Sequence, residues 1–489
     1  MKRDPRTNYT LEGDKPLKGV RVALIYPPYG PVKNEPGIKV VKENYGVFPN
    51  LSLLYAAGTL ENAGAQVLFI DAQAEGLSLD QTVARLERFR PDFAAYTITT
   101  YLFYQSLRWI EAIKAAYPCP VIVGGVHMSI YPFETLHHRA IDYAVTGEAE
   151  QSLVPLVRSI LDRQPLREIK GIAFRHPDTD QVIVTANAPA LQDVDSAPFP
   201  ARHLLDNTLY YSFISQYRNF SALITSRGCP YKCIFCEQGA KQFRGRSAKN
   251  VVDEIEVGIK EFGIREYDVF DSSFTINRHR VHAICEEILK RKLSFVWSAR
   301  TRADCVDKDM LRMMAKAGCN RIYYGIESGN EAILRTLLKE SDLNQIKQAV
   351  SDTKKVGINT FGYFMIGNPG ETRESVEQTI RFSQELELDY AQFSKVTPMP
   401  ATELYTMFLK ETGRDFWREY ILDENVDQAI PRPGCELSEA EVLELTREAY
   451  MRFYYRPSYM MKALFRMKSA EEVRRSAKTA WEMLAGGIA

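Results

Sequence analysis

Three of the eight cysteines in this 489-residue chain lie within one short run, at Cys229, Cys233 and Cys236. Their spacing is C-x3-C-x2-C, and the run directly follows an apolar stretch that is predicted to be a strand. Three thiolates on one loop can converge on a metal centre. Structural zinc needs four closed ligands, and neither a fourth cysteine nor a histidine lies nearby in the sequence. We therefore expect a cuboidal four-iron cluster with one iron open to a further ligand, rather than zinc or three buried free thiols.

The remaining five cysteines are dispersed and are expected to be core thiols: Cys119, Cys285, Cys305, Cys319 and Cys435. A second cluster is not expected. Eight cysteines in a chain of this length are too few for a disulfide scaffold, which indicates a reducing, cytoplasmic compartment.

The overall composition excludes several classes of protein. Lys and Arg number 62, and Asp and Glu also number 62, so the formal net charge is zero, which argues against a general nucleic-acid binder. A hydrophobic content of 45% and a charged content of 25% exclude a largely disordered chain. No apolar run approaches the ~18 residues of a membrane span. The polar N-terminus shows no signal peptide.

Residues 1–165 are predicted to form an α/β domain. Short apolar strands are expected at 20–26, 66–71, 93–99, 120–123 and 141–146. Amphipathic helices are expected between and after them, at 51–63, 79–88, 104–117 and 150–161. This alternation predicts a parallel, doubly wound, Rossmann-like sheet, in which ligands bind beyond the carboxyl ends of the strands.

The rest of the chain is predicted to contain a linker, a second α/β domain and a helical region. Residues 166–215 are a Pro- and Asp-rich linker with one hairpin, 172–175 and 181–185. Residues 216–415 hold strands at 222–225, 266–270, 295–299, 321–326, 359–366 and 390–396, with helices between them. Periodicity leaves open whether this second parallel sheet is flat or curves into a partial barrel. Residues 416–489 look helical.

The second domain resembles the radical S-adenosylmethionine (SAM) superfamily over roughly residues 218–410. The cysteine run matches its signature, with an aromatic residue, Phe235, directly before the last cysteine. Further matching blocks stand in order at the predicted strand ends: Asp271, Arg300, Glu327 with Ser328, and Gly367. The resemblance implies a partial (βα)6 barrel in which Cys229, Cys233 and Cys236 hold a [4Fe-4S] cluster.

The resemblance also implies a reaction. SAM chelates the open iron, and an electron from the cluster cleaves SAM. The resulting 5′-deoxyadenosyl radical activates a C–H bond of the substrate. By the same analogy the backbone at Phe235 contacts adenine, and Arg300 pairs with the SAM carboxylate. Glu327 and Ser328 hold the amino group or the ribose.

Two further residues, Asp271 and Gly367, belong to the same expected cofactor-binding set, Gly367 through a tight turn. For the charged residues at strand ends, a simple ion pair is the alternative. No catalytic residue is assigned.

The first domain resembles the cobalamin-binding domains that precede many radical SAM enzymes. Matching features include Pro27-Pro28 after the first strand and Gly124-Gly125 after the fourth. Glycines leave no Cβ between the backbone and a flat ligand, so Gly124 and Gly125 are expected to contact cobalamin. His127 is interpreted as a structural histidine in preference to a polar ligand contact. Relatives with a histidine ligand carry Asp-x-His-x-x-Gly after the first strand, whereas residues 27–37 contain no histidine, so the cobalt is expected to lack an imidazole from this loop.

The domain order resembles that of cobalamin-dependent radical SAM methyltransferases and of anaerobic magnesium-protoporphyrin IX monomethyl ester cyclase. We expect radical modification of an organic small molecule, with cobalamin-dependent C-methylation as the leading outcome. The alternatives are oxidative cyclisation, radical rearrangement or a cobalamin-free radical SAM reaction. From another class, the alternative is a non-catalytic iron–sulfur or corrinoid sensor. A flavodoxin or ferredoxin is the expected reductant.

Residues 447–467 are rich in Tyr, Phe, Met and Arg. They are interpreted first as helices packed on the barrel. One alternative is a lid over an apolar, lipid-like or tetrapyrrole-like substrate. Another is a basic amphipathic face at a membrane surface, which would make the protein peripheral to the membrane.

Overall fold

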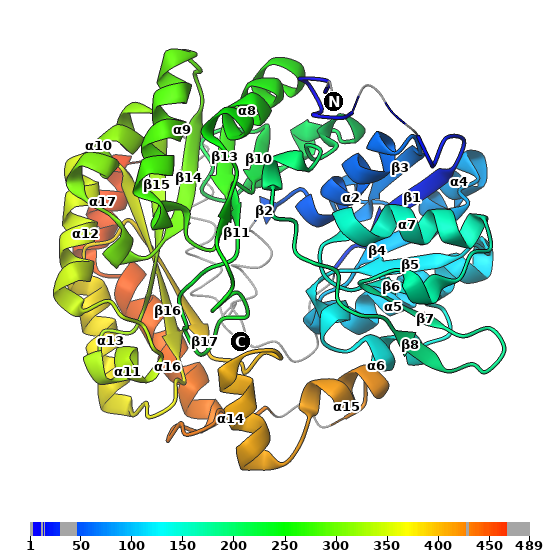
Figure 1. The fold of residues 1–489 in the computed structure, drawn as a ribbon. Coiled ribbons are helices and arrows are strands. Elements are labelled where there is room, and N and C mark those ends of the chain that lie inside the picture. The colour runs from blue at the N-terminus through cyan, green and yellow to red at the C-terminus, as the bar shows by residue number, and fades with distance from the viewer. Residues whose placement is uncertain (1–2, 11–12, 14, 30–45, 427–429, 467–489) are drawn as a thin grey trace.

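The computed structural model describes residues 3–10, 13, 15–29, 46–426 and 430–466. The chain forms two α/β units, each built on its own sheet, and the helices α14 (Glu403–Thr412) and α15 (Phe416–Leu422) run between them (Figure 1). This architecture confirms the predicted fold class. In the described ranges, two short antiparallel ribbons accompany the sheets: β2 (Gly46–Val47) with β9 (Tyr211–Ser212), and β11 (Ser226–Arg227) with β12 (Arg244–Gly245).

The first sheet has seven strands. Their spatial order is β3 (Gln66–Asp71), β1 (Arg21–Tyr26), β4 (Phe93–Thr97), β5 (Val121–Gly124), β6 (Tyr143–Val145), β7 (Ile172–Arg175) and β8 (Val182–Val184). The first five are parallel, as predicted, and the chain switches direction around β1. The hairpin predicted within the linker, β7 and β8, extends the edge of this sheet in antiparallel pairing.

Helices cover both faces of the first sheet, because its strands are apolar on both sides. They are α2 (Leu51–Asn62), α3 (Ala72–Glu75), α4 (Leu79–Phe89), α5 (Phe103–Ala116), α6 (Pro132–His137) and α7 (Ala149–Leu161). Along β1, Val22 and Leu24 pack in the core under α2 and α7, while Ala23 and Ile25 pack in the opposite core with α5 and α6. This burial on both faces defines a doubly wound sheet.

The second sheet has six parallel strands in sequence order. They are β10 (Phe220–Leu223), β13 (Glu266–Val269), β14 (Val296–Thr301), β15 (Cys319–Glu327), β16 (Asn359–Ile366) and β17 (Tyr390–Lys395). The sheet curls, with α8 (Ala248–Phe262), α9 (Arg278–Lys290), α10 (Lys308–Lys316), α11 (Glu331–Thr336), α12 (Leu343–Lys355) and α13 (Arg373–Glu385) on its outside (Figure 1). It is therefore a partial (βα)6 barrel, which settles the question that periodicity left open.

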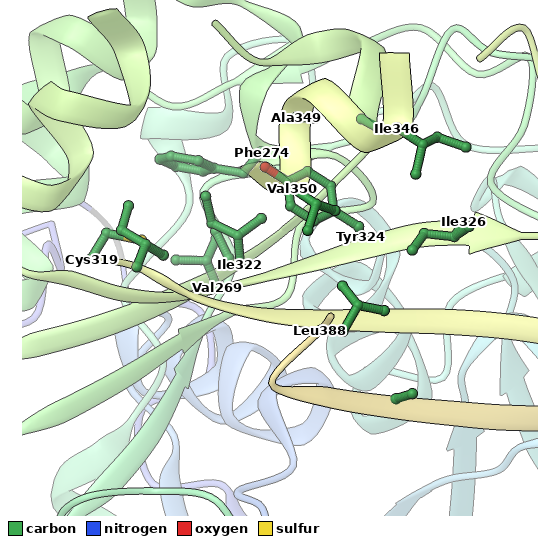
Figure 2. Close-up of a cluster of buried hydrophobic side chains, with 14 of the residues drawn as sticks. Val269, Phe274, Cys319, Ile322, Tyr324, Ile326, Ile346, Ala349, Val350 and Leu388 are labelled. Carbon is green, nitrogen blue, oxygen red and sulfur yellow. The ribbon is translucent and has the colours of Figure 1, made fainter. Parts of the chain in front are cut away.

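The main core of the barrel lies between its strands and the outer helices. Ile322, Tyr324 and Ile326 of β15 face apolar residues of α12, including Ile346 and Val350 (Figure 2). Because side chains alternate along a strand, Tyr323 and Glu327 of the same strand face the inside of the barrel. The inner face is thus the one that carries polar groups.

The helices beyond residue 416 divide between the two units. Phe416, Trp417 and Ile421 of α15 pack in a core of the first unit, together with Tyr405 and Phe408 of α14. α16 (Glu439–Tyr454) packs in the barrel core and is followed by α17 (Pro457–Arg466). Predictions for residues 467–489 lie outside the described residues. Within the described part of the chain, no helix is long and apolar enough to cross a membrane.

Candidate functional site

The three cysteines lie on a loop closed at its base by the ribbon of β11 and β12. Arg227 pairs with Arg244 across this ribbon, and residues 228–243 form the loop between them. Gly228 has φ +79°, and a Cβ placed there would lie 2.2 Å from the Gln242 carbonyl oxygen. Only glycine fits this narrow base. The loop follows β10, so it stands at the carboxyl end of the barrel strands, where βα enzymes place their chemistry.

Backbone hydrogen bonds wind the loop around its cysteines. The Lys241 amide donates to the Cys229 carbonyl at 2.9 Å, and the Cys236 amide donates to the Cys233 carbonyl at 3.1 Å. The Gly239 amide in turn donates to the Cys236 carbonyl at 3.1 Å. All three thiols are free, and Cys229 is only 8% exposed. The loop is shaped by its backbone, which leaves the sulfur atoms available.

Two cations lie beside the sulfurs. Arg302 Nη1 is 3.6 Å from Cys233 Sγ, and its guanidinium stacks 3.8 Å above the Tyr231 ring. Lys339 Nζ is buried and bonds Glu327 Oε1 at 2.9 Å. Burial raises the pKa of the Cys233 thiol, while the charges of Lys339 and Arg302 act to lower that pKa. The pKa of this thiol stays raised overall, and the two cations act against that rise, toward the thiolate form that binds metal.

The loop does not form a site for a single metal ion. Within the described ranges, no three His, Cys, Asp or Glu side chains converge on one position that fits an ion. Zinc at ~2.3 Å from each sulfur would bring the sulfurs to within about 4 Å of one another. A four-iron cluster instead binds each thiolate at a different iron, and so needs the sulfurs spread apart. Three thiolates on one loop are the donor set of a four-iron cluster with one open iron.

Asp271 holds the start of the cysteine loop. Its carboxylate is 1% exposed and accepts four hydrogen bonds, from the amides and hydroxyls of Thr225 and Ser226, at 2.5–3.0 Å. These two residues lead directly into the ribbon below Cys229. The structure thus gives Asp271 a positioning role, and its predicted contact with the cofactor stays a prediction.

Arg300 forms an ion pair inside the barrel. Its guanidinium binds both oxygens of Asp268, at 2.7 and 3.0 Å, and lies 4.1 Å from the centre of the Phe270 ring. Burial raises the pKa of the Asp268 carboxyl, and Arg300 acts to lower that pKa. This is the ion pair that the sequence analysis named as the alternative, and the predicted contact with SAM stays a prediction.

The fourth barrel strand ends in a bulge that turns Glu327 and Ser328 in different directions. Glu327 has φ +68°, and the pairing of β15 with β16 shifts register between Gly325 and Glu327. Its carboxylate meets Lys339 on the side of Cys233. The Ser328 hydroxyl lies instead 3.1 Å from Thr379 of α13. The structure brings Glu327, but not the Ser328 hydroxyl, toward the cysteine loop.

Phe235 lies in the cysteine loop itself, and Gly367 directly follows β16. Phe235 is half-buried and packs against a small apolar cluster that includes Leu337 and Val396. Gly367 has φ +98°, and its amide donates to the buried carboxylate of Glu371 at 2.5 Å. A Cβ at Gly367 would lie 2.5 Å from Arg432 Cδ. Gly367 therefore forms the predicted tight turn.

In the first unit, the predicted glycines lie at the carboxyl end of β5. A Cβ at Gly124, or at Gly147 after β6, would meet no atom within 4 Å. Gly125 differs from both, because a Cβ there would lie 2.7 Å from the Ile98 carbonyl oxygen; its φ of +108° is positive, as is the φ of +93° at Gly147. This bare edge lies beside the switch point of the sheet, where flat ligands bind doubly wound folds, and it fits a corrinoid ring. The histidine-free loop falls mostly in 30–45, outside the described residues.

His127 is a structural residue, as interpreted from the sequence. Its ring nitrogens lie 2.9 Å from the Thr100 hydroxyl and 3.1 Å from the Thr135 hydroxyl. The ring is 1% exposed, and burial lowers its pKa to about 3. His127 is thus neutral and fully hydrogen-bonded.

A surface cleft of about 590 Å³ lies elsewhere, at the amino end of β17. Its lining includes Leu388 and Tyr459 but none of the predicted site residues. Because βα folds bind ligands at the carboxyl ends of their strands, this cleft is not the site.

Comparison with known proteins assigns a family to each of the two α/β units. The profile of the Radical SAM superfamily matches residues 223–383, and that of the B12 binding domain matches residues 37–157. An uncharacterised methyltransferase of Pyrococcus horikoshii is 31% identical over 456 residues, which are 92% of this chain and 95% of that protein. The chain belongs to the B12-binding radical SAM enzymes. This membership confirms the predicted family and its cofactors: a [4Fe-4S] cluster, SAM and cobalamin.

Other similar proteins agree with this assignment. The anaerobic magnesium-protoporphyrin IX monomethyl ester cyclase of Rubrivivax gelatinosus is 29% identical to this enzyme, across 90% of this chain and 78% of the cyclase. The structure of the cobalamin-dependent SAM radical enzyme OxsB is 19% identical. It superposes with a TM-score of 0.71 over 96% of this chain and 71% of OxsB. The superposition shows that the fold is shared.

Sequence reasoning missed two residues of this enzyme's site, Arg302 and Lys339. Arg302 lies two positions after the predicted Arg300. Because side chains alternate along a strand, this spacing was the signal that both arginines lie on one face near the carboxyl end of β14. Lys339 follows α11 without a motif. Only the folded chain brings it beside Glu327.

Proposed function

We propose that Cys229, Cys233 and Cys236 hold the cluster, and that the enzyme methylates an unactivated carbon of a small organic substrate. When bound, the cluster and SAM supply a radical that removes a hydrogen atom, and cobalamin supplies the methyl group. One observation carries the proposal. The base of the cysteine loop is joined by ion pairs to Glu148, directly after the open Gly147 of the first unit. The two cofactor-binding edges therefore belong to one connected structure.

The side chains beside the cysteines suit the polar end of SAM. An amino acid zwitterion needs a cation for its carboxylate and an anion for its ammonium group. Lys339 and Glu327 supply this pair of charges, both less than 10% exposed and close to Cys233. Arg302 also pairs with Asp304, so its contact with Cys233 offsets part of the negative charge of that one thiolate. These residues bind and orient SAM, and the cofactors supply the bond cleavage.

The substrate and the reductant are part of the same proposal. Phe270 stays 38% exposed at the end of β13, and Tyr323 and Tyr363 stack with their ring centres 5.9 Å apart on neighbouring strands. Tyr323 is buried, so the exposed Phe270 ring is the aromatic surface that suits an apolar or planar substrate. A small iron–sulfur or flavin protein, of the ferredoxin or flavodoxin class, is the proposed electron donor. The cytoplasm, with a peripheral membrane position for an apolar substrate, is the proposed location.

The test is an anaerobic assay of the reconstituted enzyme with trideuteromethyl-SAM, dithionite and an extract of small molecules. Methylation consumes two SAM and two electrons for each substrate C–H. It yields the methylated product, methionine, 5′-deoxyadenosine and S-adenosylhomocysteine. We expect a product in which a trideuteromethyl group has replaced hydrogen. Formation of 5′-deoxyadenosine with no labelled product would refute methylation.

Oxidative cyclisation or rearrangement is the second proposal. It is favoured by the cyclase of Rubrivivax gelatinosus, which matches 90% of this chain. It predicts a product that has lost hydrogen or kept its composition, with no label from the methyl group. A cobalamin-free reaction predicts turnover without added corrinoid. A non-catalytic sensor would form no 5′-deoxyadenosine, and membership of an enzyme family argues against it.

A further inference from the structure

The two residues at the base of the cysteine loop carry the same charge and lie side by side. Arg227 and Arg244 are cross-strand partners in the antiparallel ribbon of β11 and β12. Like charges opposite each other destabilise a strand pair. The loop that carries Cys229 therefore closes on a ribbon that repels itself, unless an anion lies between the two guanidinium groups.

The first unit supplies that anion. Glu148 Oε1 accepts from Arg244 at 2.6 Å, and its Oε2 lies 3.4 Å from Arg227. Glu150 Oε1 accepts from Arg227 at 2.5 Å. All four side chains are at most 22% exposed, and their charges sum to zero. Such partly buried, hydrogen-bonded pairs fix geometry better than exposed ones.

We call the ion pairs of Glu148 and Glu150 with Arg227 and Arg244 the clamp. The clamp also holds the linker between the two units in place. The Leu191 amide donates to Glu148 Oε2 at 2.8 Å, and the Leu191 carbonyl accepts from Arg244 at 2.6 Å. Glu148 itself follows Gly147, the glycine whose missing Cβ leaves the edge of the first sheet open. Arg227 precedes Gly228 and Cys229. One carboxylate thus links the loops of the two cofactor edges.

We propose that Glu148 and Glu150 are positioning residues that clamp the cysteine loop to the B12-binding edge and thereby fix the distance between the cluster and cobalamin. The inference rests on the two-cofactor chemistry proposed above. Without the clamp, the ribbon opens at its base and the cluster samples a range of positions. Neither glutamate touches the reacting atoms.

The test compares E148Q/E150Q with E134Q and the unmodified chain. Glu134 forms an ion pair with Arg418 of α15, which holds this helix on the first unit and lies away from the cysteine loop. Hydrogen exchange of the cofactor-free chain reports opening at residues 146–152 and 226–245. We expect exchange there to be about tenfold faster in E148Q/E150Q and unchanged in E134Q.

Pulsed EPR on the loaded enzyme then measures the distance between the reduced cluster and cob(II)alamin. We expect one narrow distance in the unmodified chain and in E134Q, and a broad distribution in E148Q/E150Q. Unchanged exchange would overturn the clamp. Faster exchange with an unchanged distance would make it a structural contact only, and would overturn the positioning role. If neither cofactor loads, the proposed function fails, and the exchange result alone decides whether the clamp exists.

Discussion

The two cofactor-binding edges of this enzyme are built in opposite ways. The edge of the barrel presents side chains, including Cys233, Arg302 and Lys339, that hydrogen bonds and ion pairs hold in place. The edge of the first sheet presents bare backbone at Gly124 and Gly147, where an added Cβ would meet no atom within 4 Å. The edge of the barrel offers side-chain donor atoms, and the edge of the first sheet offers open space beside its backbone.

This difference follows from what each ligand needs. A metal cluster needs thiolates at defined places, so the chain must keep specific side chains and the cations that stabilise them. A flat corrinoid needs close approach to the backbone, so the chain must keep side chains away. Substitutions at the two edges should therefore impair cofactor binding in different ways. At the barrel edge the damage comes from removing a side-chain atom, and at the edge of the first sheet it comes from adding one.

The largest expected effect is loss of the cluster. Cys233→Ala removes one thiolate from the loop and should abolish both iron binding and the visible absorption of the cluster. Cys435→Ala, which removes a half-buried thiol outside the loop, is the matched control and should keep both. Iron analysis and absorption spectra of anaerobically reconstituted protein make the measurement. Normal iron content in Cys233→Ala would remove this cysteine from the ligand set.

The next effect is loss of cobalamin through added bulk. Gly124→Leu should leave folding intact, because the open space accepts the first atoms of the side chain. It should raise the dissociation constant of cobalamin about tenfold, as expected for overpacking a close contact. Titration with aquacobalamin, followed by absorption, gives the affinity. Unchanged affinity would show that the corrinoid does not approach Gly124.

The neighbouring residue sharpens this test. Gly125→Ala places a Cβ at φ +108°, close to the Ile98 carbonyl, so the cost falls on the fold itself. We expect the free energy of unfolding to drop by about 1–3 kcal/mol in the cofactor-free chain. Chemical denaturation of the two variants separates a ligand-facing glycine from a backbone-constrained one. Equal stability of Gly125→Ala and the unmodified chain would contradict the assignment.

Sequence reasoning found what is local and missed what depends on long-range register. The alternation of strands and helices, and the three cysteines within one loop, are readable because each signal lies in a short window. Arg302 beside Cys233, and Lys339 beside Glu327, depend on how β14, β15 and β16 align, including the register shifts at Trp297 and Gly325. The curl of the second sheet likewise depends on pairing between strands.

The same limit applies to the glycines. Gly124 and Gly125 are identical in sequence terms, yet one faces open space and the other is forced by its φ. Only backbone coordinates separate them. Glu148 and Arg244 illustrate the distance involved, because they lie 96 positions apart in the chain and make one ion pair.

A smaller effect is expected where a carboxylate positions the loop. Asp271→Asn keeps the size of the side chain but weakens four hydrogen bonds from Thr225 and Ser226. We expect a loss of about 1–3 kcal/mol in the free energy of unfolding, and partial iron occupancy under limiting iron. Asp206→Asn is the control, because an exposed asparagine caps a helix as well as aspartate does. Full occupancy with unchanged stability would reject the positioning role of Asp271.

The smallest effect concerns the pH dependence of the first unit. Burial lowers the pKa of His127 to about 3, below its ordinary value of 6.5. The unfolded chain therefore takes up the proton first as pH falls, and this group's contribution to stability is lost from about pH 6.5 downward. Between pH 7 and pH 5 the loss should be about 2 kcal/mol.

His127→Gln cannot take up this proton. The variant should start from a lower free energy of unfolding at pH 7, because its hydrogen bonds to Thr100 and Thr135 change. Its stability should then fall less steeply toward pH 5 than that of the unmodified chain. Because carboxylates titrate in both proteins, the difference between their denaturation curves isolates the histidine. Parallel pH profiles would mean that His127 is accessible to protons in the folded state, and that the core beneath the B12-binding edge is more open than its burial indicates.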